Sequence, residues 1–342
     1  MNIQGLNKKE LKELILQNEH QTSKELTGTA LLEKQRYYQD KVYARGLIEF
    51  TNICKNNCLY CGIRAENKNV NRYRLDKRTI LSCCSTGHSL GFSTFVLQGG
   101  EDLHFTADKM CDIIYSIKEK YSDCAVTLSV GEKSKEEYAQ YKSAGADRFL
   151  LRHETANDLH YQKLHPEEMS LKSRKECLYN LKELGFQTGA GFMVGSPYQT
   201  AENLAEDLLF LKELQPEMVG IGPFLPHHDT PFRNFEKGPL ALTITMIALT
   251  RLMLPKVLLP ATTALATLDP KNGRKMGFLA GANVVMPNLS PVDNRCNYSL
   301  YDNKLSTGNE AAQSIAFLKK EIEASGFVLD MSRGDNIDFQ TE

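Results

Sequence analysis

The chain has 342 residues, of which 42% are hydrophobic and 24% charged, a composition that excludes collagen-like and disordered classes. Its 41 Lys and Arg residues nearly balance 42 Asp and Glu, so the formal net charge is -1 and nothing global attracts nucleic acid or an anionic membrane. No apolar stretch approaches the roughly 18 residues of a membrane span, and charges from Lys8 to Glu13 stand where a signal peptide needs an apolar run. We therefore expect a cytoplasmic protein with neither nucleic acid nor a membrane as its partner.

Residues 1–40 form a charged N-terminal helical segment, and from residue 41 onward short β-rich runs alternate with helical segments. One helical segment, for example, is marked by the apolar spacing of Met110, Ile114, Ile117 and Tyr121. The repeated order of strand, helix and strand predicts parallel pairing, because parallel neighbours need a crossover connection. The eight β-rich runs cover residues 46–51, 94–98, 125–130, 147–152, 188–194, 218–224, 257–262 and 282–287.

Eight such units without a Pro- or Ser-rich linker predict an α/β fold, a single (β/α)8 TIM barrel over residues 41–305, in preference to a partial barrel of six strands. Residues 306–342 predict a C-terminal helix and tail that pack on the barrel, because Ala311, Ile315, Leu318 and Ile322 have helical spacing and Gly326 ends the pattern. The active sites of such barrels lie at the carboxyl ends of the strands, so we expect functional residues there.

Cys54, Cys58 and Cys61 form a CX3CX2C motif just after the first predicted strand. Three thiolates in a compact loop can hold three irons of a cubane cluster and leave the fourth iron open to another ligand. Structural zinc is the alternative, but it normally needs four protein ligands, and the fourth would have to be the distant His88 or His104. The other six cysteines are expected to be structural, as buried free thiols usually are; they are Cys83, Cys84, Cys111, Cys124, Cys177 and Cys296.

With the aromatic Tyr60 before its last cysteine, the motif resembles the signature of the radical S-adenosylmethionine (SAM) enzymes. Further blocks, over about residues 45–305, resemble the [FeFe]-hydrogenase maturases of that superfamily, and biotin synthase and methylornithine synthase share the general layout. The resemblance implies a [4Fe-4S] cluster whose open iron chelates SAM, and reductive cleavage of SAM to a 5'-deoxyadenosyl radical. The blocks are GLIEFTN (46–52), LLRHETAN (150–157), GAG (189–191), MVGIGPF (218–224), PATTA (260–264) and GANVVMP (281–287).

Carried onto this chain, the resemblance implies three groups of site residues, most of them at strand ends. The catalytic cluster ligands are Cys54, Cys58 and Cys61. The residues around SAM are Tyr60, Gln98, Gly99, Gly100, Glu101, Glu154, Arg174, Tyr298 and Tyr301. The residues around an internal substrate cavity are Thr127, Ser129, Arg152, Thr262, Thr263 and Met286.

The polar residues at the strand ends suit these roles on chemical grounds. A carboxylate at a barrel mouth, such as Glu154, can accept hydrogen bonds from ribose hydroxyls, and Arg174 can form a bidentate pair with a carboxylate, although a solvated helix face is the usual fate of an Arg. Gly99 and Gly100 would let an amino group approach bare backbone, or would simply close a tight turn. The run after Arg152 is not HExxH, because Asn157 stands at the second His position.

Two other patterns are weaker. The glycines at 189, 191 and 195 do not fit GxGxxG, so a dinucleotide site is not expected. His227, His228 and Asp229 could bind a metal, but we expect a polar loop whose adjacent side chains point apart. Some maturases carry a second cluster near the carboxyl end; only Cys296 remains in that region here, so we expect a single cluster.

The resemblance also implies partners: an organometallic or other small iron substrate, a low-potential electron donor and companion hydrogenase maturases. Two other functions stay open from the sequence. One is a radical SAM enzyme that rearranges carbon skeletons or inserts sulfur, as methylornithine synthase and biotin synthase do. The other is a non-catalytic metal-binding barrel that docks partners.

Overall fold

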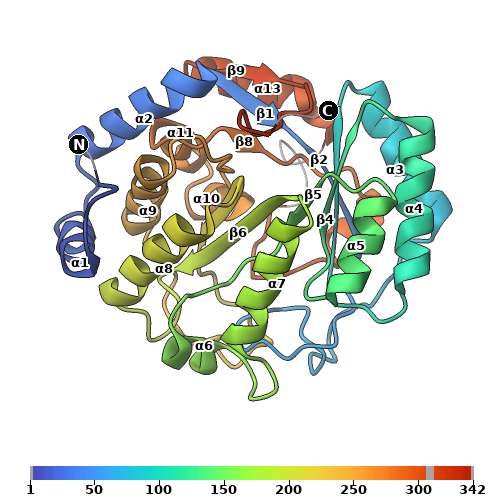
Figure 1. Cartoon of the computed structure of the whole chain (residues 1–342), viewed down its shortest axis with the longest axis horizontal. Helices are drawn as coiled ribbons and strands as arrows, with labels where there is room; N and C mark the ends of the chain where they lie inside the picture. Colours follow the sequence, from blue (N-terminus) through green and yellow to red (C-terminus); the bar gives the residue numbers. More distant parts are fainter. Residues whose placement is uncertain (1–2, 306–311, 340–342) are drawn as a thin grey trace.

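The computed structural model describes residues 3–305 and 312–339. Strands and helices alternate along most of the chain (Figure 1). The helices are α1 (Lys8–Gln17), α2 (Lys24–Tyr38), α3 (Lys77–Ser89), α4 (Ala107–Lys120), α5 (Lys135–Ser143), α6 (Asp158–Leu164), α7 (Leu171–Glu183), α8 (Ala201–Leu214), α9 (Leu240–Met253), α10 (Thr263–Leu268), α11 (Gly273–Leu279), α12 (Val292–Arg295) and α13 (Ile315–Ala324), with a 3-10 turn, η2, at Ala312–Ser314. The strands are β1 (Lys41–Ala44), β2 (Gly46–Thr51), β3 (Thr94–Gly99), β4 (Ala125–Ser129), β5 (Arg148–Leu150), β6 (Gln187–Val194), β7 (Met218–Pro223), β8 (Val284–Val285) and β9 (Val328–Asp330).

Strands β2 to β7 pair in parallel in sequence order and form a six-stranded sheet. The sheet continues less regularly: Leu258 bridges Met218 of β7, and Pro260 bridges Val284 of β8. Because β8 pairs with β1, and Asn288 bridges Leu47 of β2, the described strands and bridges return to the first strand. The α/β barrel fold is therefore confirmed. The run at 257–262 is held only by isolated bridges, because Pro260 has no N–H to donate to a ladder.

The first predicted strand continues backward past Arg45 into β1, which pairs on its outer side with β9, a strand that the sequence pattern did not predict. Helix α13 does form at the predicted place, with Leu318 and Ile322 buried, and the chain leaves it through Gly326 at φ 87°. Ala311, expected in the same helix, lies outside the described residues.

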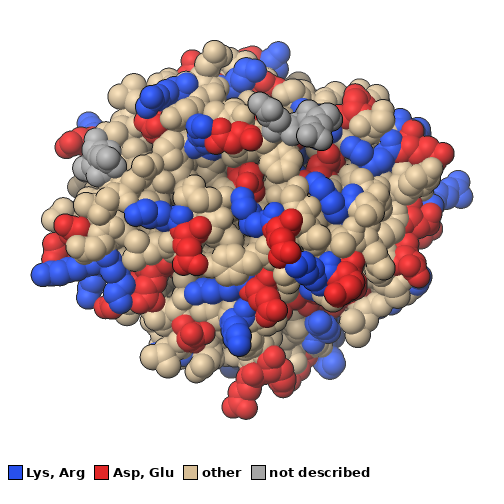
Figure 2. Space-filling model, viewed as in Figure 1, with Lys and Arg blue, Asp and Glu red and all other residues tan. Residues whose placement is uncertain are grey.

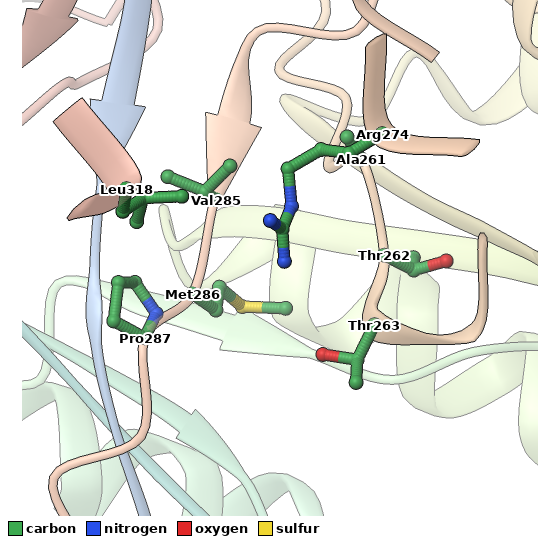
Figure 3. A pocket seen from close by; sticks show the side chains of 8 residues that line it. All are labelled: Ala261, Thr262, Thr263, Arg274, Val285, Met286, Pro287 and Leu318. Carbon is green, nitrogen blue, oxygen red and sulfur yellow. The ribbon is translucent and has the colours of Figure 1, made fainter. Parts of the chain in front are cut away.

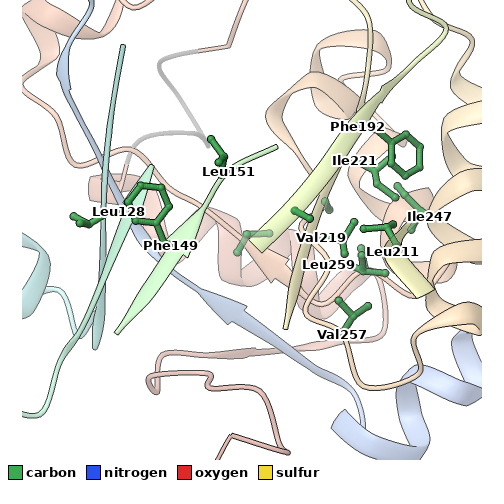
Figure 4. Close-up of a cluster of buried hydrophobic side chains, with 14 of the residues drawn as sticks. Leu128, Phe149, Leu151, Phe192, Leu211, Val219, Ile221, Ile247, Val257 and Leu259 are labelled. Carbon is green, nitrogen blue, oxygen red and sulfur yellow. The ribbon is translucent and has the colours of Figure 1, made fainter. Parts of the chain in front are cut away.

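Alternation along the strands divides the barrel interior from the helical layer. Phe192 of β6 and Ile221 of β7 point outward and pack with Leu211 of α8 and Ile247 of α9 (Figure 4). Within each strand, the residues directly before and after these side chains face inward, because successive side chains of a strand point to opposite faces. The fold therefore places Thr127, Ser129 and the bare backbone of Gly220 and Gly222 inside the barrel.

The chain after β9 crosses the end of the barrel where the strands begin. Arg148, at the start of β5, donates to the carbonyl of Arg333 and to the carboxylate of Asp335, while Arg45 donates to the carbonyl of Gly334. Asn336 donates to the backbone carbonyls of Glu217 and Lys256, which precede β7 and the run at 257–262. We call residues 331–339 the C-terminal plug, because they close this end of the barrel.

The surface carries mixed charge. On the face drawn in Figure 2, basic and acidic side chains are interspersed, in keeping with the near-neutral total. Within the described residues, no helix is both long and apolar enough to cross a membrane. Of the six cysteines expected to be structural, Cys83, Cys84, Cys124 and Cys177 are buried and Cys111 is half-buried. Cys296, which follows the short helix α12 in the late loop, is exposed, so the expected burial is wrong for it.

Candidate functional site

The three clustered cysteines lie in the loop between β2 and α3, at the carboxyl end of β2. Burial raises the pKa of all three thiols, that of Cys61 to about 12, and the charges of neighbouring cysteines add to the shift at Cys58 and Cys61. The backbone N–H of Glu101 donates to the Sγ of Cys54 across 3.4 Å. Buried thiols so close together become thiolates only if a metal supplies positive charge, and N–H bonds to sulfur are typical of iron-sulfur ligands. The donor set thus fits a cluster.

Two glycines allow the cysteine loop to pack tightly. A Cβ on Gly100 would lie 2.3 Å from the carbonyl oxygen of Ile53 and 2.7 Å from the Cβ of Cys54. A Cβ on Gly62 would lie 2.3 Å from the ring of His227 and from the carbonyl oxygen of Ser299. Gly100 is therefore required for contact with the cysteine loop itself, a reason that the sequence could not show.

Glu101 and Arg174 are joined through Glu132, a residue that the sequence analysis missed. The Glu101 carboxylate pairs with Lys55 at 3.3 Å and accepts the N–H of Glu132 at 3.1 Å. The Glu132 carboxylate in turn lies 2.7 Å from the Nε of Arg174 and accepts the hydroxyl of Ser173. Arg174 is 8% exposed, so it is not on a solvated helix face. The positive charge of Arg174 also reaches Cys58: burial raises the pKa of this thiol, and Arg174 acts to lower it.

Tyr60 is held by a buried histidine. Its hydroxyl lies 3.1 Å from the Nε2 of His165, and the Nδ1 of His165 lies 3.0 Å from the carbonyl oxygen of Tyr161. A carbonyl only accepts, so Nδ1 carries the proton and the Tyr60 hydroxyl donates to Nε2. Burial lowers the pKa of His165 to about 3, which keeps this ring neutral. Tyr60 is thereby fixed beside the cluster ligands.

Glu154 has a strained backbone at the end of the fourth predicted strand. Its φ is 66°, in the left-handed region, and its carboxylate lies 3.0 Å from the guanidinium of Arg152. Behind it, the Nδ1 of His153 accepts the N–H of Gly191, and Asp207 accepts the N–H of Ala156. Strain in a cleft that the surrounding structure holds in place is typical of functional sites.

Thr262, Thr263 and Met286 line one small cavity, together with Arg274 of α11 (Figure 3). Figure 3 shows the Arg274 guanidinium extending between Met286 and the two threonines, while Glu321 of α13 pairs with it at 2.9 Å. Thr262 is the N-cap of α10, yet its hydroxyl makes no capping bond. Arg274 follows Asn272 and Gly273 in a polar run, which gives no sequence signal of a cavity residue.

The other predicted substrate residues, Thr127, Ser129 and Arg152, face the barrel interior. Thr127 and Ser129 lie on β4, and Ser129 is opposite Gln98 of β3. The Arg152 side chain passes over Gly220 and the Thr262 hydroxyl over Gly222, two positions on the same face of β7. Within the described residues, the buried hydroxyls of Thr127 and Thr262 and the Nε of Arg152 have no hydrogen-bond partner. Unpartnered polar groups inside a barrel fit a polar ligand.

The late loop carries two tyrosines, Tyr298 and Tyr301, and is held against the ends of β2 and β3. The Tyr298 hydroxyl accepts a hydrogen bond from Gln98 at 3.3 Å, and Lys304 joins the loop to the buried Glu49. Burial raises the pKa of Tyr301. The negative charge of Glu49 raises this pKa further, and the positive charge of Arg152 lowers it. The structure thus brings predicted residues of the cysteine loop, the strand ends and the late loop close together: the charge of Arg174 reaches Cys58, that of Glu154 reaches Tyr60, and Gln98 bonds Tyr298.

The histidine pair behaves differently from expectation. His227 and His228 do not point apart: their rings stack with centroids 4.4 Å apart and planes 18° apart. One ligand atom from each of His227, His228 and Asp302 lies within 4.8 Å of the others, close enough to hold a metal ion. His228 pairs with Asp302 of the late loop at 2.6 Å.

Comparison with known proteins agrees with this site. Residues 48–211 match the model of the radical SAM superfamily. The chain is 46% identical over 316 residues, 92% of its own length and 90% of the relative's, to the [FeFe] hydrogenase maturase subunit HydE of Thermotoga maritima. It belongs to the radical SAM superfamily and, within it, to the HydE family.

More distant relatives share the architecture. A 3-methylornithine synthase of Methanosarcina acetivorans is 29% identical over 83% of this chain and 81% of its own. The crystal structure of methylornithine synthase (PylB) matches with a TM-score of 0.82 at 25% identity, covering 96% of both chains. The FeFe-hydrogenase maturase HydG from Carboxydothermus hydrogenoformans matches in fold, with a TM-score of 0.78 at 20% identity over 95% of this chain and 76% of that one.

Membership of this superfamily decides between the remaining alternatives. The chain is an enzyme whose cofactors are a [4Fe-4S] cluster and SAM, so the zinc site and the non-catalytic barrel are discarded. The observed site fits both cofactors: three thiols with N–H donors around one loop, and charged groups of both signs beside them. The HydE relative is also far more similar than the methylornithine synthase relative.

Proposed function

We propose that this radical SAM enzyme acts in the maturation of [FeFe]-hydrogenase, in the assembly of the diiron unit of its active site. The observation that carries the proposal is the 46% identity to a HydE maturase along 92% of the chain. By the same resemblance, its substrate is a cysteine-bound iron carbonyl cyanide species from the companion tyrosine-cleaving maturase. Its product passes to a scaffold GTPase, and a low-potential donor supplies electrons.

Within this proposal, Cys54, Cys58 and Cys61 would hold the cluster, which supplies the electron that cleaves SAM. Arg174 would pair with the SAM carboxylate, because Glu132 lies against its Nε at 2.7 Å and its charge reaches the cluster ligand Cys58. Glu154 would accept hydrogen bonds from the ribose. The wall around these groups would comprise Tyr60, Gln98, Gly99, Gly100, Glu101, Tyr298 and Tyr301.

The substrate would enter the interior beyond SAM. Arg152 offers a fixed positive charge, and Thr127 and Thr262 offer buried hydroxyls without a hydrogen-bond partner in the described chain. These groups suit the carboxylate of a small amino-acid-like ligand better than a long apolar acid. Ser129, Thr263 and Met286 would complete the walls, and the C-terminal plug would exclude water from the opposite end.

The test is a maturation assay in an extract that lacks only this protein. Adding the reconstituted enzyme should restore hydrogenase activity, and SAM with a strong reductant should yield 5'-deoxyadenosine and methionine. Formation of 5'-deoxyadenosine without restored maturation would reject the maturase proposal in favour of carbon-skeleton or sulfur-inserting chemistry. Methylornithine and biotin precursors are the substrates to try in that case.

A further inference from the structure

The loop that carries Cys54, Cys58 and Cys61 has little regular structure of its own. Between the end of β2 and the start of α3 the chain forms turns. These turns are joined by isolated hydrogen bonds, such as the one from the N–H of Ala65 to the carbonyl of Asn56. Such a loop loses much conformational entropy when it is ordered, and three thiols must be aligned within it before any cluster binds. Contacts from outside the cysteine motif must therefore hold its shape.

Arg72 contacts this loop at both ends. Its Nη1 donates to the carbonyl of Asn52 at 2.5 Å and to that of Ile63 at 2.8 Å. Asn52 lies two residues before the first cysteine of the motif, and Ile63 lies two residues after the last. One nitrogen thus joins the two points where the cysteine motif begins and ends.

The second terminal nitrogen extends this contact along the loop. The Nη2 of Arg72 donates to the carbonyl of Arg64 at 2.6 Å and to that of Asn67 at 3.0 Å. Four carbonyls from one loop therefore converge on a single planar guanidinium. The rigid fork of Arg matches this arrangement, whereas the single ammonium of Lys cannot reach four separated acceptors.

Arg72 is itself held in place by the end of β2. Arg74 forms an antiparallel bridge with Thr51, and Leu75 donates its N–H to the carbonyl of Phe50. The buried Asn52 side chain donates to the carbonyl of Asn71 and accepts the N–H of Tyr73. The backbone on both sides of Arg72 is thus fixed to the barrel, so the guanidinium is presented from a rigid element.

The charge of Arg72 also reaches the cysteines. The Nη1 of Arg72 donates to carbonyls only two residues before Cys54 and two residues after Cys61, so its positive charge lies beside the cysteine motif. A positive charge near a cluster favours its reduced form, which carries one more electron.

We propose that Arg72 is a positioning residue that clamps the cysteine loop in its cluster-binding shape and raises the reduction potential of the cluster. This inference rests on the assignment of Cys54, Cys58 and Cys61 as cluster ligands and goes beyond it. Arg72 touches no reacting atom. It acts through the backbone carbonyls on either side of the motif and through its charge.

The experiment separates the clamp from the charge with two variants. Arg72→Lys keeps a positive charge but loses the fork, so iron loading at limiting iron should slow, and iron loss to a chelator should accelerate, by at least about tenfold. Its reduction potential should stay near that of the parent. Arg72→Met should show the same loss of loading and, in the cluster that does form, a potential lower by about 59 mV, a tenfold change in the one-electron equilibrium.

Arg78→Lys, the same substitution at an exposed position of α3, is the matched control and should load as the parent does. Far-ultraviolet circular dichroism and urea unfolding of the cluster-free proteins check that the variants fold. If Arg72→Lys folds and loads at the parental rate, the clamp is rejected; if the potential of Arg72→Met equals that of the parent, the role of the charge is rejected. A Cys58→Ala variant that still binds four irons would instead overturn the ligand assignment.

Discussion

Strand β5 runs between two arginines whose surroundings differ, and the difference separates the two ends of the barrel. At its start, each guanidinium nitrogen of Arg148 has a hydrogen-bond acceptor: the side chains of Gln187, Thr94 and Asp335 and the carbonyl of Arg333. Two residues beyond its end, Arg152 has a charge contact with Glu154 at 3.0 Å, but its Nε and Nη2 make no hydrogen bond within the described chain. Both side chains face the interior of the barrel, where Arg148 bonds Thr94 of β3 and Arg152 passes over Gly220 of β7.

The comparison shows what each end is built for. Burial disfavours the charge of Asp335, but Arg148 and Arg333 hold its pKa down, to about 2, so the plug keeps a charged network closed. A buried charge with all its partners in place contributes to a single rigid structure, and removing one partner is costly. At the other end, polar groups that lack partners in the described chain retain their capacity to bind a ligand. The first end is therefore structural, and the other holds the candidate site.

The largest expected effect is at the cysteine loop. Cys58→Ala should abolish the cluster and reduce bound iron from about four per chain to nearly none. A cubane cluster with one open iron needs three thiolate ligands, and the variant has two. Cys83→Ala, which alters a buried thiol of α3, should load normally. Iron and sulfide analysis of anaerobically reconstituted protein measures both. A colourless protein with one zinc per chain would contradict the assignment.

The next effect is at the plug. Asp335→Ala should lower the free energy of unfolding by about 3 kcal/mol, because it leaves the fully buried Arg148 without its carboxylate. Asp338→Ala removes an exposed ion pair with Lys256 on the same tail, and should change the free energy of unfolding by less than about 1 kcal/mol. Urea unfolding compares the two variants. Equal effects would mean that the plug does not close the barrel through Arg148.

The sequence predicted one end of the barrel far better than the other. Cys54, Cys58 and Cys61 lie within eight residues, and Glu154 follows a recognisable strand, so local spacing carries their chemistry. Arg148 and Asp335 are 187 residues apart in sequence, and no periodicity relates them. The same holds for Glu132 and Arg274, whose roles depend on partners brought in by tertiary folding.

The positions of the barrel strands could be predicted wherever the pattern of apolar side chains follows the backbone hydrogen bonds. The eight β-rich runs mark the ring correctly, but the pattern could not show that Pro260 interrupts the seventh strand or that the first strand extends backward to Lys41. The pairing of β9 with β1 could not be predicted either, because a three-residue strand is too short to show an alternation of apolar and polar residues.

A smaller effect is expected at Arg152, and it tests whether the open end binds substrate. Arg152→Met should reduce maturation at limiting substrate by about ten- to a hundred-fold, the value of one charge-assisted hydrogen bond. Iron content and SAM affinity should stay near parental, since the proposal assigns them to the cysteines, Glu154 and Arg174. Arg152→Lys, which keeps the charge, should recover part of the rate. Maturation by Arg152→Met at the parental rate would place the substrate elsewhere.

The smallest effect is expected at two buried threonines, Thr127 and Thr94. Replacing each by Val should change the free energy of unfolding with opposite sign at the two ends of the barrel. Thr127, in β4, is 2% exposed, and its hydroxyl has no hydrogen-bond partner in the described chain. Thr94, at the start of β3, is fully buried, and its hydroxyl accepts from Arg148 at 3.1 Å and donates to the carbonyl of Arg333 at 2.9 Å. Thr and Val have nearly the same shape, so each substitution removes a hydroxyl and leaves the packing in place.

Thr127→Val should raise the free energy of unfolding of the substrate-free protein by about 1 kcal/mol, because it removes the cost of burying an unpaired hydroxyl. Thr94→Val should lower it by about 2 kcal/mol, because it leaves buried groups of the plug without their partner. Urea unfolding measures both, and the maturation assay should show the opposite order, with the more stable Thr127→Val the less active. If both substitutions destabilise the protein equally, the hydroxyl of Thr127 is already satisfied, and the difference between an open and a closed end of the barrel does not extend to β4.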